Sequence, residues 1–267
     1  MHAPSSLLLL VLTACTGPAL DETGSDTDAD TDADTDADTD STVWTIPVDA
    51  TGDGTRTVEA WTAEALHVGL NEIAFRVLES DGEPSDGLVL TQAPLMDMGK
   101  MSHACPYTEP AGTGDGWYAS EVVFVMAGAW ADTVTVSDGT SSLPYAFTDL
   151  AVAETGMAQS LIVGSETWMV TFDIAGEPVL GANPFVLTVH RKESAMSFPA
   201  VPDLTAIIEP FMPSMGHGSR GNVDPVYAGD GKYAGMVVFS MEGAWQVDFT
   251  LADGTGTEAT TSFELEI

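Results

Sequence analysis

The sequence predicts an all-β protein, with two tandem immunoglobulin-like β-sandwich domains after a disordered acidic linker. Short apolar runs such as 168–174 and 185–190 are separated by clusters of Gly, Pro and Asp, a pattern typical of strands joined by turns. No long stretch has the periodicity of an amphipathic helix. The chain after the linker also repeats itself, which indicates two copies of one domain.

The repeat consists of several short blocks that recur about 115 residues apart. Two copies of one domain therefore fill 44–155 and 156–267. About seven strands in roughly 110 residues favour an immunoglobulin-like sandwich for each copy. The blocks that pair are 69–71 with 181–183, 114–119 with 229–234, 122–130 with 237–245, and 138–139 with 253–254.

Alternation within the strand candidates predicts which side chains are buried. In the run that contains 236–240, Val237, Phe239 and Met241 share one face, as a half-buried antiparallel strand requires. We expect Phe124 and Met126 to face inward in the same way. The residues Trp130 and Trp245 are expected to anchor the core, and Asp138-Gly139 and Asp253-Gly254 to form hairpin turns.

The first residues predict export and a lipid anchor. The apolar run 7–12 is too short to span a bilayer, and it ends in Leu12-Thr13-Ala14-Cys15, which resembles a bacterial lipobox. The resemblance implies a signal peptide over 1–14 and a lipid on the sulfur of Cys15, although no Lys or Arg precedes the run. Residues 15–43 are an Asp/Thr/Ala linker whose like charges predict an extended, disordered spacer.

The charge balance restricts the possible partners. Seven Lys and Arg stand against 41 Asp and Glu, for a formal net charge of −34. Such a surface repels phosphate backbones, so nucleic acid is excluded as a partner and cations are favoured as small ligands. No nucleophile elbow, zinc-protease motif, phosphate loop or dinucleotide fingerprint occurs, and we therefore expect no enzyme.

A methionine and histidine motif occurs once in each copy. The two instances are Met98-x-x-Met101-x-His103 and Met212-x-x-Met215-x-His217. Thioether sulfur and imidazole nitrogen form a soft donor set that suits Cu(I). In the first copy Cys105 is a further soft donor. The alternative is that the methionines only fill gaps under a sandwich edge.

The surroundings of the motif favour the second copy as a metal site. Each motif follows a strand candidate, 88–95 or 205–211, which predicts a loop or strand edge. Glycines flank His217, so its ring is expected to be accessible, whereas the charge of Lys100 in the first copy opposes a bound cation. The other histidines, His67 and His190, are expected to be ordinary surface or half-buried residues.

Three blocks of the second copy resemble the YtkA-like domain family. They are Met212-Pro213-Ser214-Met215-Gly216-His217-Gly218, Gly229-Asp230-Gly231-Lys232-Tyr233 and Phe239-Ser240-Met241-Glu242-Gly243-Ala244-Trp245. Members of that family look like small β-sandwiches on the outer side of bacterial membranes and are suspected of binding copper. The resemblance implicates Met212, Met215 and His217. The internal repeat extends it to Met98, Met101 and His103.

The sequence therefore predicts a lipid-anchored protein of the cell envelope that binds copper, as Cu(I), for sequestration or delivery. Its partners would be the membrane, through the anchor, and a copper-trafficking or envelope protein. Thr16 after Cys15 favours the outer membrane, facing the periplasm or the cell surface. The alternative is a surface-displayed sandwich protein without metal that serves as a spacer or contacts another envelope protein.

Overall fold

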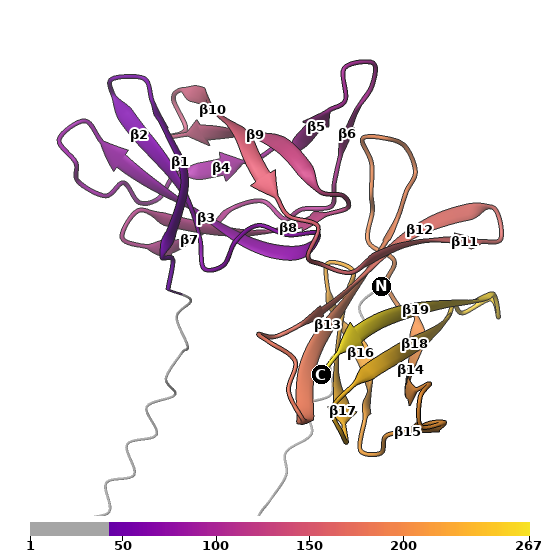
Figure 1. Cartoon of the computed structure of the whole chain (residues 1–267). Helices are drawn as coiled ribbons and strands as arrows, with labels where there is room; N and C mark the ends of the chain where they lie inside the picture. The colour runs from indigo at the N-terminus through magenta and orange to yellow at the C-terminus, as the bar shows by residue number, and fades with distance from the viewer. Residues whose placement is uncertain (1–42) are drawn as a thin grey trace, which may run out of the picture. The chain divides into compact units, whose positions relative to one another are not determined.

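The computed structural model describes residues 43–267, which consist of strands, bridges and turns without helix. The expected signal peptide, the lipidation of Cys15 and almost all of the expected linker lie outside the described residues. Within the described part, no helix is long and apolar enough to cross a membrane. The all-β prediction is confirmed (Figure 1).

The first sandwich is formed by two antiparallel sheets. One sheet has the order β1-β2-β3-β8-β7, and the other has the order β10-β9-β5-β6 with β4 also paired to β9. The strands are β1 (Ile46–Gly52), β2 (Arg56–Thr62), β3 (Gly69–Glu79), β4 (Val89–Thr91), β5 (Leu95–Asp97), β6 (Ser102–Ala104), β7 (Ala111–Gly114), β8 (Trp117–Phe124), β9 (Gly128–Ser137) and β10 (Ser142–Val152).

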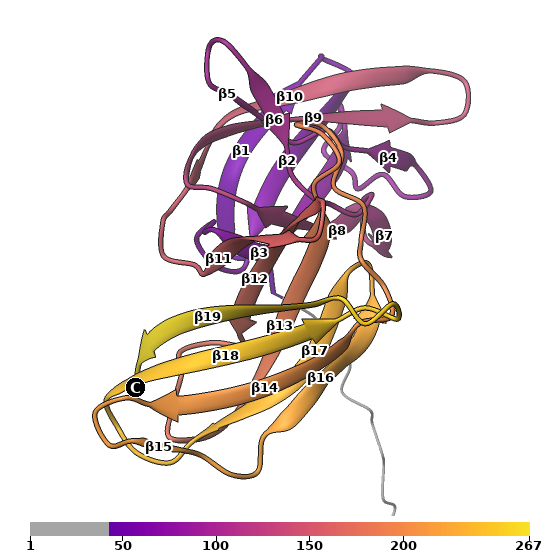
Figure 2. The same cartoon turned by 90° about the vertical axis from the view of Figure 1, so that its right-hand side faces the viewer.

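The second sandwich has the same plan, and Figure 2 shows its two layers of strands most clearly. One sheet has the order β11-β12-β13-β17-β16 and the other β15-β14-β18-β19. Its strands are β11 (Ala158–Val163), β12 (Glu166–Ile174), β13 (Gly181–Arg191), β14 (Thr205–Met212), β15 (His217–Gly218), β16 (Val223–Gly229), β17 (Lys232–Phe239), β18 (Ala244–Ala252) and β19 (Glu258–Glu266). Because short edge strands are counted, each sandwich has more strands than the seven expected.

Each sandwich encloses its own apolar core between its two sheets. The inward positions alternate with outward ones, most regularly in β14 and β18. As predicted, Phe124 and Trp130 are buried in the first core, and Phe239 and Trp245 in the second. The prediction for Met126 is wrong, since its side chain is exposed. Strand β8 ends at Phe124, so Met126 lies in the following turn and the alternation no longer applies.

Matching details in the two sandwiches reflect the internal repeat. Asn71 and Asn183 each donate from Nδ2 to two backbone carbonyls just before or at the start of β3 or β13. Asp115 and Asp230 have positive φ angles of 52° and 49° in the turns that open β8 and β17. A left-handed backbone at a non-glycine residue is uncommon, so its recurrence at equivalent positions indicates one fold used twice.

The two sandwiches differ at one strand beside the motif. The second has a continuous β14, whereas its counterpart in the first is split into β4 and β5. The predicted strand 88–95 is therefore interrupted. At the break, Asp132 Oδ1 accepts a hydrogen bond from the backbone N of Ala93 at 2.9 Å, in place of a strand partner.

Candidate functional site

Each methionine and histidine motif forms a hairpin at the edge of a sheet. In the first sandwich β5 pairs with the edge strand β6, and in the second β14 pairs with the edge strand β15. The histidine lies directly opposite a methionine in both, since Met96 pairs with His103 and Met212 pairs with His217. The predicted position at a strand edge is confirmed.

The strand register of the two hairpins aligns their methionines differently from the sequence motif, which had matched Met98 with Met212. Met96, and not Met98, is the structural counterpart of Met212, because each lies opposite the histidine of its hairpin. The preceding residues agree: Pro94-Leu95-Met96 matches Pro210-Phe211-Met212. Met101 and Met215 remain equivalent, each two residues before its histidine. Met98 belongs to a turn that is longer in the first hairpin.

Met96 and Met212 are structural residues of the hairpins. Both are buried. The methyl group of Met96 lies over Gly128, the first residue of β9, and the methyl group of Met212 lies over Gly243, just before β18. A Cβ at these glycines would lie 2.9 Å from Met96 Cε and 3.3 Å from Met212 Cε. The glycines therefore make room for the methionine methyls. Met96 and Met212 thus fill gaps under the edge of a sandwich, which is the alternative to metal binding that the sequence left open.

The remaining motif methionines are exposed. Met98, Met101 and Met215 have relative exposures of 46%, 64% and 60%. Cys105, in contrast, is 2% exposed and lies in the core of the first sandwich, beyond the hairpin. Burial and the nearby Asp132 carboxylate raise the pKa of its thiol well above the ordinary value, so it stays protonated at neutral pH.

Both motif histidines have one ring nitrogen fixed by the backbone. His103 Nδ1 lies 3.1 Å from the carbonyl oxygen of Ala104, and His217 Nδ1 lies 3.0 Å from that of Gly218. A carbonyl oxygen only accepts, so Nδ1 carries the hydrogen in each case. Nε2 is then the nitrogen whose lone pair is available, which is how a metal-binding histidine is commonly oriented. His103 is buried and His217 is half-buried.

In the first sandwich a methionine from a different loop completes a donor pair. His103 Nε2 lies 3.0 Å from Met126 Sδ. Met126 is held in place because Trp130 donates its indole N–H to the Met126 carbonyl at 3.0 Å, and the ring of Trp130 packs edge-on against His103 at 5.1 Å. Met126 was not in the predicted ligand set, because no sequence spacing links the β8–β9 turn to the β5–β6 hairpin.

The second sandwich contains the same framework with a looser arrangement. Trp245 donates to the carbonyl of Met241 at 3.0 Å, and its ring lies 6.3 Å from that of His217. Met241 is half-buried and packs against the core. Among residues 43–267, no group of three or more His, Cys, Asp or Glu side chains is arranged to hold a metal.

The histidines outside the motif are not alike. His67 is half-buried, as expected, with Nδ1 3.3 Å from the carbonyl oxygen of Ala65. The expectation for His190 is wrong, because it is 6% exposed and its Nδ1 has no hydrogen-bond partner. Burial lowers the pKa of His190 to about 4. The cause is its place at the end of β13, where the β16–β17 turn covers the ring: a Cβ at Gly231 would lie 2.8 Å from His190 Nε2.

Comparison with known proteins gives one family match. Residues 170–250 match the model of the family described as YtkA-like. The resemblance expected from the sequence is confirmed for this part of the second sandwich. No curated protein matches the chain.

Several solved structures resemble the chain at low identity. They include the Escherichia coli adhesin FdeC, at 14% identity and a TM-score of 0.27, covering 82% of this chain and 65% of that one. A conserved domain protein from Bacillus anthracis has 8% identity and a TM-score of 0.34, covering 84% and 90%. Domains 5–6 of the S-layer protein SbsC have 14% identity and a TM-score of 0.26, covering 82% and 97%. The chain thus spans 65% of the length of the solved adhesin chain.

Proposed function

We propose that this chain is a lipid-anchored protein of the cell envelope that binds Cu(I) through its two edge hairpins and sequesters or delivers it. The lipid would be attached to the sulfur of Cys15, and it would anchor the chain in the outer membrane. Two sandwiches on an acidic chain would attract cations toward the hairpins.

The observation that carries the proposal is the pair formed by His103 Nε2 and Met126 Sδ, 3.0 Å apart. With its hydrogen on Nδ1, His103 directs a nitrogen lone pair at a sulfur that also has only lone pairs to offer. Two facing acceptors are favourable when a cation lies beside them. A soft nitrogen and sulfur pair matches Cu(I) better than calcium, magnesium or manganese.

The residues that would hold copper in the first sandwich are His103 and Met126, with Met98 and Met101 exposed on the same hairpin. A thioether carries no proton to displace, so its binding changes little with pH. Bound copper would supply the transferable cation, and the exposed methionines would let an acceptor reach it. In the second sandwich the corresponding groups are His217 and Met215, with Met241 nearby in the β17–β18 turn.

A competition titration of the full chain with a chromophoric Cu(I) chelator under anaerobic conditions tests the proposal. The wild type is expected to take up two Cu(I) ions, and each hairpin variant one. The variants are Met126→Leu with His103→Gln, and Met215→Leu with His217→Gln. A matched control is Met236→Leu, which removes a half-buried methionine of β17 away from both hairpins. Equal uptake by wild type and both variants would refute the proposal.

The location is tested separately. Full-length protein with Cys15→Ser is expected to appear in the soluble fraction, whereas wild type carries the mass of a lipid and sediments with membranes. A wild type that keeps its first residues and carries no lipid would contradict the anchor. Copper uptake measured on both forms keeps this result independent of the metal site.

A second candidate function is a surface-displayed sandwich protein without metal. The observation in its favour is the complete burial of Met212, which serves the core of the second sandwich and leaves two motif residues for a ligand. In that case Met212→Leu would destabilise the sandwich, and none of the variants above would change copper uptake. Retention of another envelope protein by the immobilised full chain, unaffected by a Cu(I) chelator, would support it.

A further inference from the structure

The two sandwiches belong to one compact unit and contact each other through two polar side-chain pairs. His67 Nε2 lies 3.7 Å from Asp173 Oδ1, and Lys232 Nζ donates to Glu121 Oε1 at 2.6 Å. Asp173 Oδ1 also fills the space beside Gly69 that a Cβ would occupy. An edge of the first sandwich, formed by His67, Gly69 and Glu121, thus contacts a face of the second, formed by Asp173 and Lys232.

The internal repeat provides a second edge and a second face. The strand registers assign the counterparts, which are Val179 for His67, Gly181 for Gly69, Met236 for Glu121, Trp61 for Asp173 and Trp117 for Lys232. Hydrogen bonds agree, because the backbone N of His67 donates to Asn71 Oδ1 and that of Val179 donates to Asn183 Oδ1. We call Val179, Gly181 and Met236 the free edge, and Trp61 and Trp117 the free face.

The free edge of the second sandwich is apolar and uncovered. Val179 is 55% exposed, its neighbour Leu180 is 52% exposed, and Met236 is half-buried. Among residues 43–267, nothing lies within 4 Å of the Cβ position at Gly181, whereas the matching position at Gly69 is filled by Asp173 Oδ1. The space that a partner fills in the internal interface is therefore open here.

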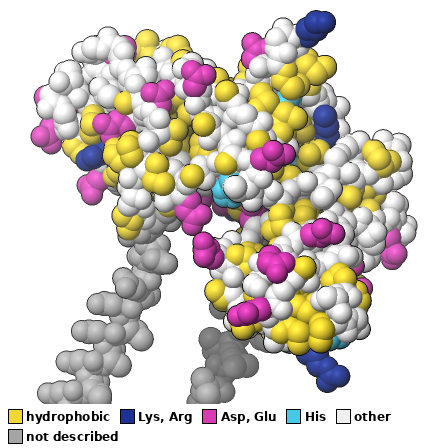
Figure 3. Space-filling view, in the orientation of Figure 1, with side chains coloured by type: hydrophobic (Ala, Val, Ile, Leu, Met, Phe, Trp, Pro, Cys, Tyr) yellow, Lys and Arg dark blue, Asp and Glu magenta, His cyan; other side chains and the backbone are white. Residues whose placement is uncertain are grey.

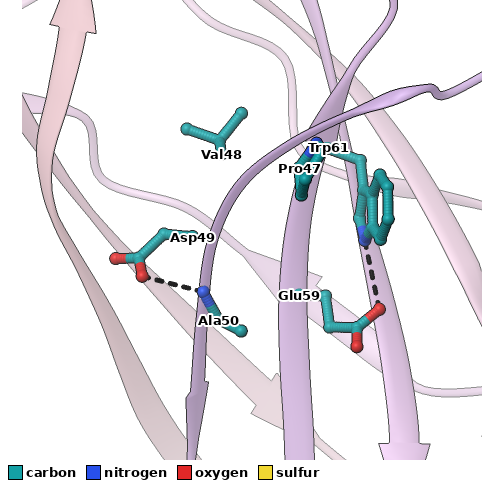
Figure 4. A pocket seen from close by; sticks show the side chains of 6 residues that line it. All are labelled: Pro47, Val48, Asp49, Ala50, Glu59 and Trp61. Carbon is teal, nitrogen blue, oxygen red and sulfur yellow. Dashed lines mark hydrogen bonds between the residues drawn. The ribbon is translucent and has the colours of Figure 1, made fainter.

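The free face of the first sandwich is aromatic, and its rings are held in place. The rings of Trp61 and Trp117 meet edge to face, with centres 6.1 Å apart, and both are half-buried. The indole N–H of Trp61 donates to Glu59 Oε2 at 3.1 Å (Figure 4). The guanidinium of Arg76 lies 5.4 Å from the centre of the Trp117 ring. Large rings fixed in this way are typical of the residues that dominate protein interfaces.

The free edge and the free face differ from the internal interface in a matched way. Where the internal interface pairs His67 with Asp173, the free surfaces have Val179 and Trp61. Where it pairs Glu121 with Lys232, they have Met236 and Trp117. A change on one side alone would set an apolar group against a charge, but both members of each pair are apolar. The free edge and the free face are therefore complementary to each other.

We propose that a second copy of this chain docks at these surfaces. The free edge of one copy packs on the free face of the next, in the arrangement of the internal interface. Such a contact is heterologous, because the two surfaces differ, so it repeats from copy to copy until a ring closes or a filament extends. The docking is independent of copper binding.

The charge of the chain predicts how salt affects this association. The formal net charge is −34, and Figure 3 shows many Asp and Glu and few Lys or Arg on the face drawn. Copies therefore repel one another, and salt screens the repulsion without weakening an apolar contact. We expect tighter association at 0.15 M salt, where the Debye length is about 8 Å, than at 0.01 M, where it is about 30 Å. Weaker association at the higher salt would contradict an apolar interface.

Sedimentation velocity of the full chain over a range of concentrations tests the docking. All forms carry Cys15→Ser, so that no lipid causes association. Trp61→Thr with Trp117→Thr removes the free face, and Val179→Ser with Met236→Thr removes the free edge. Each double variant is expected to associate at least about thirtyfold more weakly, the usual effect of truncating the main residues of an interface.

Mixing the two double variants identifies a heterologous contact. One variant keeps the edge and the other keeps the face, so an equimolar mixture should form a dimer and nothing larger. Recovery in the mixture also shows that both variants are folded. The matched control is Val89→Thr with Ile207→Thr, which changes exposed apolar residues in the other sheet of each sandwich and should associate like the parent. A parent that stays monomeric, association that survives both double variants, or a mixture without dimer would overturn the proposal.

Discussion

His103 Nε2 and Met126 Sδ lie 3.0 Å apart, although the two residues are 23 positions apart and belong to different loops. The contact exists because β5 and β9 are neighbours in one sheet, which brings the β8–β9 turn beside the β5–β6 hairpin. Trp130 holds both partners, one through its ring and the other through its N–H. The pair therefore depends on the core of the sandwich as well as on the hairpin.

The first prediction concerns Met126 alone. Met126→Leu keeps the volume of the side chain and removes the sulfur, so the affinity of the first sandwich for Cu(I) should fall by about tenfold, or about 1.4 kcal/mol. Chelator competition on the full chain measures this, with Met236→Leu as the matched control. The free energy of unfolding should change by less than about 1 kcal/mol, since Met126 is 39% exposed. An unchanged affinity would exclude Met126 as a ligand.

The second prediction concerns the glycines under the buried methionines. Gly128→Ala should lower the free energy of unfolding by about 2–4 kcal/mol, because its φ is +133° and the new Cβ would meet Met96 Cε at 2.9 Å. Gly114→Ala is the matched control, since its φ is +102° and nothing lies within 4 Å of its Cβ position. The control reports backbone strain alone. Equal losses in urea unfolding would show that the methionine contact contributes nothing.

The third prediction concerns Asp132, which is buried at the split between β4 and β5. Burial raises its pKa to about 7, and its Oδ2 has no hydrogen-bond partner. The folded chain then holds a proton that the unfolded chain, with a pKa near 3.8, has released. Stability should fall as the pH rises from about 4 to 7 and level off above 7.

Asp132→Asn should remove this pH dependence of the first sandwich. It should also raise the free energy of unfolding at pH 8 by roughly 1–3 kcal/mol, because no charge is then buried. The amide oxygen of the variant can still accept from Ala93 N. Denaturant unfolding at pH 5 and pH 8 measures the difference, and Glu258→Gln serves as the exposed control. A variant whose pH slope equals that of wild type would contradict the prediction.

The fourth prediction concerns His190 in the second sandwich and has the opposite sign. Its pKa is lowered to about 4, so between pH 6.5 and 4 the unfolded chain binds a proton that the folded chain does not. Stability of the second sandwich should therefore fall as the pH drops through this window. His190→Gln should flatten the slope. Amide exchange of β13 at pH 4.5 and 7 provides a readout confined to this sandwich, and an equal slope in the variant would contradict the assignment.

Much of the fold could be predicted from the sequence because it depends on local patterns. Alternation located β17, short apolar runs located β12, β13 and β14, and two Asp-Gly pairs located the β9–β10 and β18–β19 turns. The burial of Trp130 and Trp245 followed from the same patterns. The split strand was missed, because the Asp132 carboxylate reaches the backbone N of Ala93 only when the neighbouring strands are in place. In the second sandwich the residue corresponding to Asp132 is the apolar Val247.

The site was predicted in part. The strand candidate before each motif correctly indicated a position at a strand edge. However, spacing alone aligned Met98 with Met212, and only the strand register assigns Met96 to that position. Met126 could not be found from the sequence, because its proximity to His103 results from the sheet order. The one sequence feature that could have indicated Met126 is a methionine four residues before a tryptophan, Met126 before Trp130 and Met241 before Trp245. In the structure each tryptophan donates to the carbonyl of that methionine.

The edge strand β15 contains only His217 and Gly218, and β6 only three residues. So few ladder bonds make local fraying cheap compared with unfolding of either sandwich. Each hairpin can open and close many times while its core stays intact. The lifetime of anything held there would thus be set by the motion of one short strand, and amide exchange at Gly218 would report its rate.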